Sequence, residues 1–178
     1  VEPAVITGEL QRAVEARGLY YPPDPASLDI SSIGGNVAEC AGGPRAFKYG
    51  TTKRYVLALE AVLPTGEIIH TGSKAVKNVV GYDLTQLLVG SEGTLAIVTR
   101  ITLRLLPYPP ARATVMATFG DIRSAVNGVT ALVHLGVIPA SVELIDGDSL
   151  RALEAHIGRA VAPGASALLI VEADGVPA

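Results

Sequence analysis

Residues 31–50 read SSIGGNVAECAGGPRAFKYG and hold two glycine pairs, Gly34-Gly35 and Gly42-Gly43, among other small side chains. A backbone with so little side-chain cover either turns sharply or lets another group approach closely. Successive N–H groups in such a stretch can face an anion or a flat ring. The stretch therefore predicts a cofactor surface or a plain glycine-rich loop between strands, and its residues alone do not decide between the two.

The common phosphate-binding motifs do not fit these glycines. Their spacing does not match G-x-G-x-x-G, and G-x-x-x-x-G-K-[ST] occurs nowhere in the chain, which excludes the Rossmann and P-loop interpretations. A second stretch of small residues follows, Gly81-Tyr82-Asp83 and then Gly90-Ser91-Glu92-Gly93-Thr94. Taken alone, it is typical of a turn whose polar side chains satisfy its own amides.

Alternating hydrophobic residues and turn signals predict an antiparallel sheet with flanking helices over residues 1–107. The turn Leu63-Pro64-Thr65-Gly66 predicts a hairpin. The predicted elements are a helix from Thr7 with Thr7 as its cap, an extended segment at Tyr20–Ala26, strands at 53–63, 67–71 and 95–105, and a helix capped by Asp83.

The pattern changes after Pro107, Pro109 and Pro110. Residues 111–178 predict strands at 113–119, 138–145 and 167–172, and helices at 122–135 and 149–157, with Asp121 capping the first helix. This order is most of a ferredoxin-like split βαβ unit. The fold class is therefore α+β, with an antiparallel first domain and a partial ferredoxin-like α/β second domain.

Composition excludes several classes of protein. The chain has 178 residues, 49% of them hydrophobic and 17% charged, with a net charge of −3. These values exclude wholesale disorder and make a nucleic-acid partner unexpected. The chain has no apolar stretch of the roughly 20 residues that span a bilayer. One cysteine, Cys40, and no visible signal peptide predict a cytoplasmic protein.

Side chains with metal-binding or nucleophilic spacing are not found either. The three histidines, His70, His134 and His156, have no ligand spacing to one another or to Cys40, so no metal site is expected. There is no G-x-S-x-G elbow and no catalytic triad, so the catalytic residues stay unknown.

Six motifs, read in order, resemble a known family. They are Pro22-Pro23-Asp24-Pro25, Ser32-Ile33-Gly34-Gly35-Asn36, Ala41-Gly42-Gly43, Lys48-Tyr49-Gly50, Gly81-Tyr82-Asp83-Leu84 and Gly90-Ser91-Glu92-Gly93-Thr94-Leu95. Together they resemble the FAD-linked oxidases of the vanillyl-alcohol oxidase type, in the branch of glycolate oxidase FAD subunits and D-lactate dehydrogenases. The resemblance is strong up to Pro107 and weaker from Ala111 onward, where it suggests the start of a substrate-side cap domain.

The resemblance implies FAD as the cofactor and places it against three segments of the chain. The first is the extended segment, the second is the glycine-rich stretch, and the third is the start of the long strand, which would meet the adenosine half. The implied cofactor-binding residues are Pro22, Asp24, Ser32, Ile33, Gly34, Gly35, Asn36, Ala41, Gly42, Gly43, Tyr49, Gly50, Glu92, Gly93, Thr94, Ile97 and Val98.

The resemblance also implies an activity. The whole protein would oxidise a small 2-hydroxy acid, of the glycolate or D-lactate type, by hydride transfer to flavin. It would act with companion subunits of a glycolate oxidase-type complex or with copies of itself, and it could be peripheral to a membrane through such subunits. Two alternatives stay open: a non-catalytic flavin-fold subunit that acts through interfaces, and a related FAD enzyme such as an ether-lipid synthase.

Two features of the family have no match here. One is the arginine- and glycine-rich loop that binds the FAD pyrophosphate upstream of a segment like residues 1–3, and the other is the later half of the cap. We therefore expect the chain to be the middle of a longer protein and to be inactive in isolation.

Overall fold

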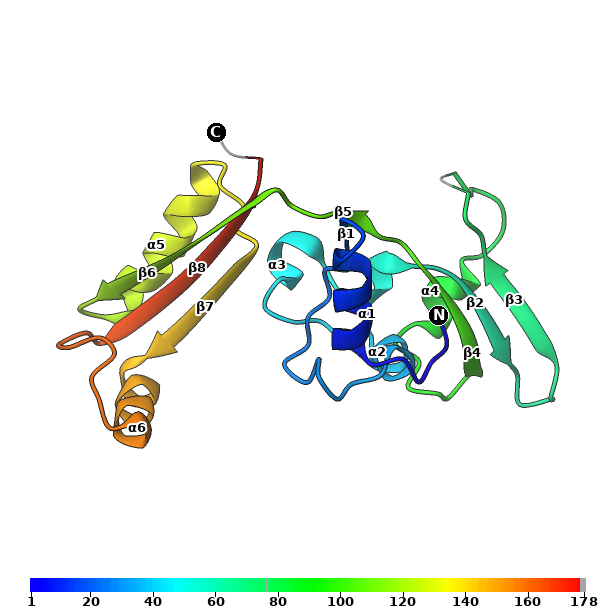
Figure 1. Cartoon of the computed structure of the whole chain (residues 1–178), viewed down its shortest axis with the longest axis horizontal. Helices are drawn as coiled ribbons and strands as arrows, with labels where there is room; N and C mark the ends of the chain where they lie inside the picture. Colours follow the sequence, from blue (N-terminus) through cyan, green and yellow to red (C-terminus); the bar gives the residue numbers. More distant parts are fainter. Residues whose placement is uncertain (76, 177–178) are drawn as a thin grey trace. The chain divides into compact units, whose positions relative to one another are not determined.

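The computed structural model describes residues 1–75 and 77–176, and the chain divides into two compact units, Val1–Tyr108 and Pro109–Ala178 (Figure 1). Helices and antiparallel sheets occur in both, as the α+β class predicted. The first unit contains α1 (Thr7–Glu15), β1 (Leu19–Tyr20), α2 (Ile33–Glu39), α3 (Ala46–Tyr49), the 3₁₀ helix η1 (Thr52–Tyr55), β2 (Val56–Val62), β3 (Ile68–Gly72), α4 (Leu84–Leu88), β4 (Ile97–Leu103) and β5 (Leu106–Pro107).

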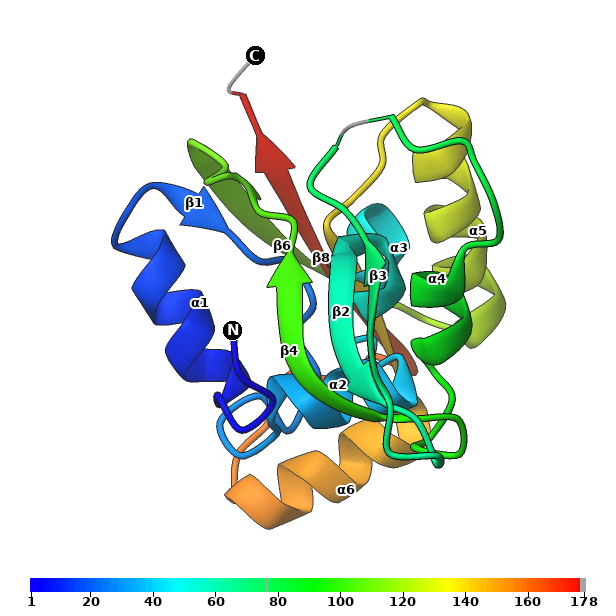
Figure 2. The same ribbon diagram turned by 90° about the vertical axis from the view of Figure 1, so that its right-hand side faces the viewer.

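A three-stranded antiparallel sheet in the order β3-β2-β4 organises the first unit (Figure 2). The predicted hairpin joins β2 to β3: the Gly66 amide donates to the Leu63 carbonyl at 2.9 Å, and Gly66 has a φ of +87°. On the inner face, Leu59 and Ile101 pack in one core with Ile33 and Val37 of α2. The sheet therefore fixes α2, and with it the glycine-rich stretch.

The long strand differs from the expected pattern at one residue. The pairing of β2 with β4 passes from Glu60↔Arg100 to Ala61↔Val98, so Thr99 is an extra residue that reverses the alternation. Ile101 is completely buried, whereas Ile97 is 70% exposed. Regular alternation along the predicted strand 95–105 would put these two isoleucines on one face, and the bulge between them puts them on opposite faces.

Glu60 connects the three strands on the outer face of the sheet. Its carboxylate accepts a hydrogen bond from the Thr99 hydroxyl at 2.8 Å, contacts His70 Nε2 at 3.2 Å and lies 3.9 Å from the Arg100 guanidinium. The Thr99 hydroxyl, followed by the Arg100 charge and His70, lowers the pKa of Glu60 below its ordinary value of 4.5.

The lowered pKa of Glu60 predicts how Glu60→Gln changes the free energy of unfolding at each pH. The ionised carboxylate contributes stability above its unfolded pKa, and this contribution disappears as the pH falls through the folded value. We expect the wild type to exceed the variant in free energy of unfolding at neutral pH, and the difference to shrink below pH 4.5. Urea unfolding at a series of pH values measures this difference, and an equal difference at pH 7 and pH 3 would contradict the assignment.

Helices α2 and α3 make up much of the glycine-rich stretch, so the alternative of a plain loop between strands does not hold there. Ser32 caps α2 by accepting from the Gly35 amide at 3.1 Å, and Ile33 and Val37 bury one face of the helix. Cys40 ends the helix in the left-handed conformation, with a φ of +54°. A cap and two apolar residues four apart thus outweigh the low helix propensity of the glycines.

Thr7 is inside α1 rather than at its cap, because Ile6 occupies the cap position. The Thr7 hydroxyl donates to the Ser31 carbonyl at 2.9 Å and accepts from the Asn36 amide at 2.7 Å. Both Thr7 and Asn36 are buried. The hydroxyl that suggested a helix cap therefore connects α1 to the start of α2.

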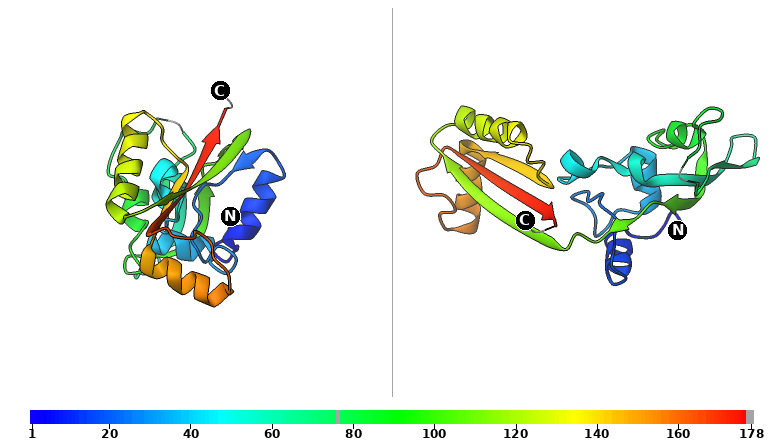
Figure 3. Two further views of the ribbon diagram at one scale, coloured as in Figure 1. Left: turned by 90° about the vertical axis from the view of Figure 1, so that its left-hand side faces the viewer. Right: turned by 90° about the horizontal axis from the view of Figure 1, so that it is seen from above.

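The second unit contains β6 (Ala111–Phe119), α5 (Ile122–His134), β7 (Ser141–Asp146), α6 (Gly147–Ile157) and β8 (Ala167–Gly175). Its sheet has the order β6-β8-β7, with β8 antiparallel to both neighbours (Figure 3). Strands β6 and β7 therefore run parallel on either side of β8, which is the predicted split βαβ arrangement.

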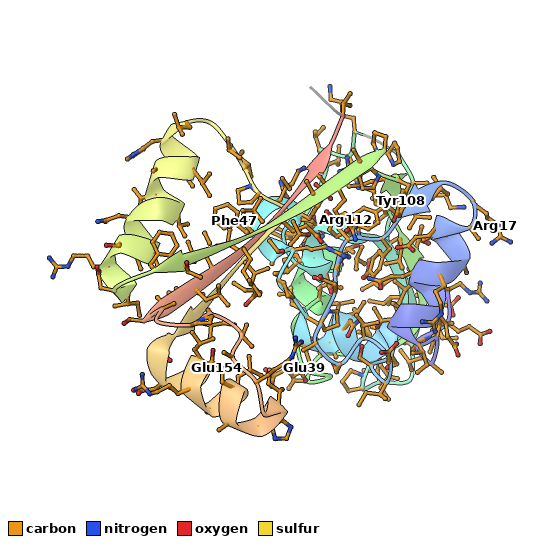
Figure 4. The ribbon with its side chains drawn as sticks, turned by 60° about the vertical axis from the view of Figure 1, so that its left-hand side comes forward. Arg17, Glu39, Phe47, Tyr108, Arg112 and Glu154 are labelled. Atoms are coloured by element: carbon orange, nitrogen blue, oxygen red, sulfur yellow. The ribbon has the colours of Figure 1, made fainter. Side chains whose placement is uncertain are left out.

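Acidic side chains fix the helices of the second unit. Asp121 accepts from the Ser124 amide at 2.8 Å, as predicted, and Asp146 caps α6 through the Ser149 amide at 2.7 Å. Glu154 on α6 accepts from the amides of Val161 and Ala162 at 2.8 and 3.0 Å (Figure 4). These contacts tie α6 to the segment that leads into β8.

Candidate functional site

A groove of about 390 Å³ lies in the first unit where α2, the turn after α4 and the start of β4 meet. Its size is within the range of small-molecule sites, about 300–1,000 Å³. The side chains around it are small or apolar, and none is ionisable. The lining residues are Pro3, Ala4, Ser32, Gly34, Gly35, Ala38, Leu88, Ser91, Gly93, Ala96, Ile97 and Val98.

The N-terminal segment forms one wall of the groove by pairing with the start of α2. The Gly34 amide donates to the Pro3 carbonyl, and the Ile33 amide to the Val5 carbonyl, both at 2.8 Å. A Cβ on Gly34 would lie 2.5 Å from Pro3 Cβ, which is closer than packed atoms approach. Gly34 therefore serves the close packing of the wall rather than an open surface.

The turn from Gly90 to Thr94 forms the opposite wall and is tied to the end of α2. The Gly90 amide donates to the Val37 carbonyl at 2.9 Å, and the Glu92 amide to the Ala38 carbonyl at 3.0 Å. Glu92 has a φ of +53°, a conformation that costs an L-residue about 1–2 kcal/mol. The two hydrogen bonds hold the turn against α2 despite this strain.

Two glycines of the groove leave room for a flat ring to approach the backbone. A Cβ on Gly35 would meet only the Ser32 hydroxyl oxygen, at 3.2 Å, and one on Gly93 would meet nothing within 4 Å. Bare backbone and small apolar side chains let a planar, largely uncharged ring approach closely. The residues present thus fit the ring portions of a flavin nucleotide, whereas none of the lining residues offers a cation to its pyrophosphate.

Six of the predicted cofactor residues are brought together in this groove. They come from the motif at residues 32–36, the motif at residues 90–95 and the start of β4, and they are Ser32, Gly34, Gly35, Gly93, Ile97 and Val98. Glu92 and Thr94 belong to the same turn; Glu92 is exposed, and the Thr94 hydroxyl donates to the Ser91 carbonyl at 2.6 Å.

A second group of predicted residues surrounds Asp24. Its carboxylate accepts from the Arg45 amide at 3.2 Å and lies 3.4 Å from the Arg45 guanidinium. A Cβ on Gly43 would lie 2.2 Å from the Asp24 carbonyl oxygen, whereas one on Gly42 would have ordinary contacts. Gly43 therefore makes room for the protein's own backbone.

Substitutions of Gly43 and Gly35 are expected to differ in their effect on the stability of the protein. Gly43→Ala forces Asp24 to move, and overpacking of this kind costs about 1–3 kcal/mol in free energy of unfolding. Gly35→Ala, which has an ordinary φ and would bring its Cβ within 3.2 Å of the Ser32 hydroxyl oxygen alone, is expected to change that free energy less than Gly43→Ala does. Thermal unfolding of the two variants and the wild type tests the contrast, and equal midpoints for Gly43→Ala and the wild type would contradict the packing role.

Most of the other predicted residues are buried in the first unit or form hydrogen bonds within it. The side chains of Pro22, Ile33 and Asn36 are buried. The Ala41 carbonyl accepts from the Thr52 hydroxyl at 2.8 Å, and the Tyr49 carbonyl accepts from the Tyr55 hydroxyl at 2.8 Å. Gly50 has a φ of +79°. Contact of these residues with FAD stays a prediction.

Burial also affects the pKa of Tyr21, which precedes the Pro22-Pro23 segment. Removal from water raises the pKa of Tyr21 to about 12, so its phenol is neutral at physiological pH. The groove-lining residues include no ionisable group. The groove residues that the structure describes can therefore bind and orient a ligand.

Sequence reasoning missed six lining residues: Pro3, Ala4, Ala38, Leu88, Ser91 and Ala96. Ala38 follows Gly35 by three residues, so the helical period would have placed it on the same face once α2 was recognised. Pro3 and Ala4 reach the groove through long-range backbone pairing, for which the sequence carries no local signal.

Two searches of the described part of the chain were negative. Residues 1–75 and 77–176 hold no group of three or more histidine, cysteine, aspartate or glutamate side chains placed to bind a metal. None of the helices described is both long and apolar enough to cross a membrane.

Two family models match the chain. Residues 1–72 match the FAD binding domain, and residues 108–178 match the C-terminal domain of the FAD linked oxidases. The chain belongs to the FAD-linked oxidase family. FAD is accordingly its cofactor, and the resemblance inferred from the six motifs is confirmed.

Several curated relatives have similar sequences. The glycolate oxidase subunit GlcD of Bacillus subtilis is 47% identical over 175 residues, 98% of this chain and 37% of the relative. GlcD of Escherichia coli K12 is 40% identical over 99% of this chain and 35% of the relative. A D-lactate dehydrogenase of Anaerostipes hadrus is 36% identical over 92% of this chain and 34% of the relative. The chain thus spans about a third of the length of these relatives.

A solved structure confirms the fold. The chain superposes on alkyldihydroxyacetonephosphate synthase with a TM-score of 0.78, at 23% identity, over 98% of this chain and 34% of that one. A likeness at this identity concerns the fold alone.

Proposed function

We propose that the chain supplies part of the FAD site of an oxidoreductase that oxidises a small 2-hydroxy acid, of the glycolate or D-lactate type. The observation that carries the proposal is the open, uncharged groove in which α2, at Gly35, meets the distant segment from Gly93 to Ile97. The names of the relatives, glycolate oxidase subunits and D-lactate dehydrogenases, support the substrate class.

Each part of the groove would have a distinct task. The backbone at Ser32–Gly35 and at Gly93 would lie against a planar ring, while Ile97 and Val98 would exclude water from its edge. FAD, when bound, supplies the acceptor for a hydride from the carbon that carries the substrate hydroxyl. Because the groove holds no ionisable side chain, the group that takes the hydroxyl proton would lie outside it.

The proposal extends to partners. Because relatives carry the name of glycolate oxidase subunits, we propose that the whole protein acts with companion subunits or with copies of itself, in the cytoplasm or at a membrane through those subunits.

A chimera tests the proposed function. The 175 matched residues of Bacillus subtilis GlcD are replaced by this chain, and the purified chimera is assayed for bound FAD and for dye-linked oxidation of glycolate and D-lactate. We expect stoichiometric flavin and turnover of at least one of the acids. A folded chimera with flavin but without turnover of either acid would favour the non-catalytic alternative, and one without flavin would overturn the proposal.

A further inference from the structure

Strand β4 lines the candidate groove with its first two residues, Ile97 and Val98. Val98 pairs with Ala61 of β2 and packs against the core of the first unit, whereas Ile97 is 70% exposed. The two neighbours therefore lie on opposite faces of the strand. The outline of the groove at this end depends on Val98 being the inner residue of the two.

The bulge at Thr99 decides which of these two residues faces inward (Figure 2 shows β4 beside β2). Ile101 is completely buried, so it marks the inner face on the other side of the bulge. Strict alternation back from there would put Ile97 on the inner face and Val98 on the outer one. The extra residue reverses this order, so the smaller valine lies on the inner side and the larger isoleucine on the exposed side.

A single carboxylate, that of Glu60, contacts both residues of the bulge. One of its oxygens accepts from the Thr99 hydroxyl at 2.8 Å. The other lies 3.9 Å from the Arg100 guanidinium and 3.2 Å from His70 Nε2. The Glu60 side chain is 23% exposed, whereas those of Arg100 and His70 are 71% and 74% exposed. The carboxylate therefore lies against the sheet and holds both bulge residues on the outer face.

We propose that Glu60 is a positioning residue: its carboxylate holds the bulge on the outer face and thereby keeps Val98 on the inner side of the groove, where the cofactor binds. A bulge of this kind sets two residues of one strand, here Thr99 and Arg100, opposite one residue of its partner, here Glu60. Without that contact, regular pairing turns Val98 outward and Ile97 inward, because side chains alternate along a strand. The inference rests on the proposed function for the cofactor in the groove, but the direction of Val98 is testable without a cofactor.

Thiol labelling of the ligand-free chain tests the directions of the two side chains. In a Cys40→Ser background, Ile97→Cys and Val98→Cys are made separately, and the rate of their reaction with a maleimide is measured. We expect Ile97→Cys to react at least about tenfold faster than Val98→Cys, because a packed site must open before it reacts. Adding Glu60→Ala should lower this ratio of rates at least about tenfold, because Val98 then turns outward and Ile97 inward.

Two further variants isolate the hydrogen bond at the bulge. Thr99→Val removes the donor of that bond and should change the ratio as Glu60→Ala does. The matched control is Glu67→Ala: Glu67 also accepts a threonine hydroxyl, that of Thr65 at 2.9 Å, but in the turn between β2 and β3. A general loss of stability would speed both cysteines, so only a change of direction lowers the ratio. An unchanged ratio in Glu60→Ala, or an equal change in Glu67→Ala, would overturn the proposal.

Affinity for FAD separates this inference from the proposed function. In the chimera with Bacillus subtilis GlcD, Glu60→Ala and Thr99→Val should weaken FAD binding at least about tenfold, and Glu67→Ala should not. Lowered labelling ratios with unchanged affinity would contradict the groove as the flavin site, which belongs to the proposed function. An unchanged labelling ratio would overturn the positioning role of Glu60 whatever the affinity.

Discussion

Gly35→Val is expected to abolish FAD retention by the chimera with Bacillus subtilis GlcD while leaving the protein folded. The groove has about 390 Å³, and a Cβ on Gly35 meets only the Ser32 hydroxyl oxygen, at 3.2 Å. A branched side chain would therefore take the space of the cofactor ring without displacing the protein. We expect affinity for FAD to fall by at least about a hundredfold, equal to about 2.8 kcal/mol.

The matched control for this variant is Gly120→Val. Gly120 also has an ordinary φ and no atom within 4 Å of an added Cβ, but it lies in the second unit, outside the groove. Flavin content is measured from the absorbance of the purified proteins, and folding from circular dichroism. A yellow Gly35→Val chimera with one flavin per chain would show that the groove does not hold the cofactor.

Features with local causes could be predicted from the sequence. Asp83 and Asp121 cap their helices as expected, because a carboxylate before a helical segment accepts from an amide three residues later. The turn at Gly66 was predictable because proline and glycine stand where such a turn needs them. In each case a few neighbouring residues determine the structure.

Features that depend on tertiary contacts could not be predicted. The bulge at Thr99 reverses the strand's alternation, and the residue that stabilises this position, Glu60, is 39 residues away. The helix at Ile33–Glu39 could not be predicted because glycine has a low helix propensity and the burial of Ile33 and Val37 depends on packing against the sheet.

The candidate site shows the same division. The motif residues of the groove were identified through resemblance, and the structure brings six of them together. The structure also shows that the motif glycines have different roles. Gly34 and Gly43 allow close contact with Pro3 and Asp24, whereas Gly35 faces the groove. Only the backbone contacts across the fold distinguish these glycines, because in the sequence they look alike.

The 178-residue chain alone is expected to bind FAD weakly and to oxidise neither glycolate nor D-lactate. The pyrophosphate of FAD carries two negative charges, and the groove residues offer it no cation. The resemblance of the six motifs implies a pyrophosphate-binding loop that none of residues 1–178 matches. Loss of two charge-assisted hydrogen bonds, each about 1.5–3 kcal/mol, weakens binding by roughly a hundredfold to ten-thousandfold.

Fluorescence titration measures this binding, because the flavin emission changes when its ring leaves water. We expect a dissociation constant well above 1 µM, equal to less than about 8.2 kcal/mol of binding free energy. The chimera with GlcD restores the upstream residues of that relative, so it should bind at least about a hundredfold more tightly than the chain alone. Sub-micromolar binding by the chain, or turnover of either acid without added segments, would contradict this expectation, because the ring contacts of the groove would then suffice without a partner for the pyrophosphate.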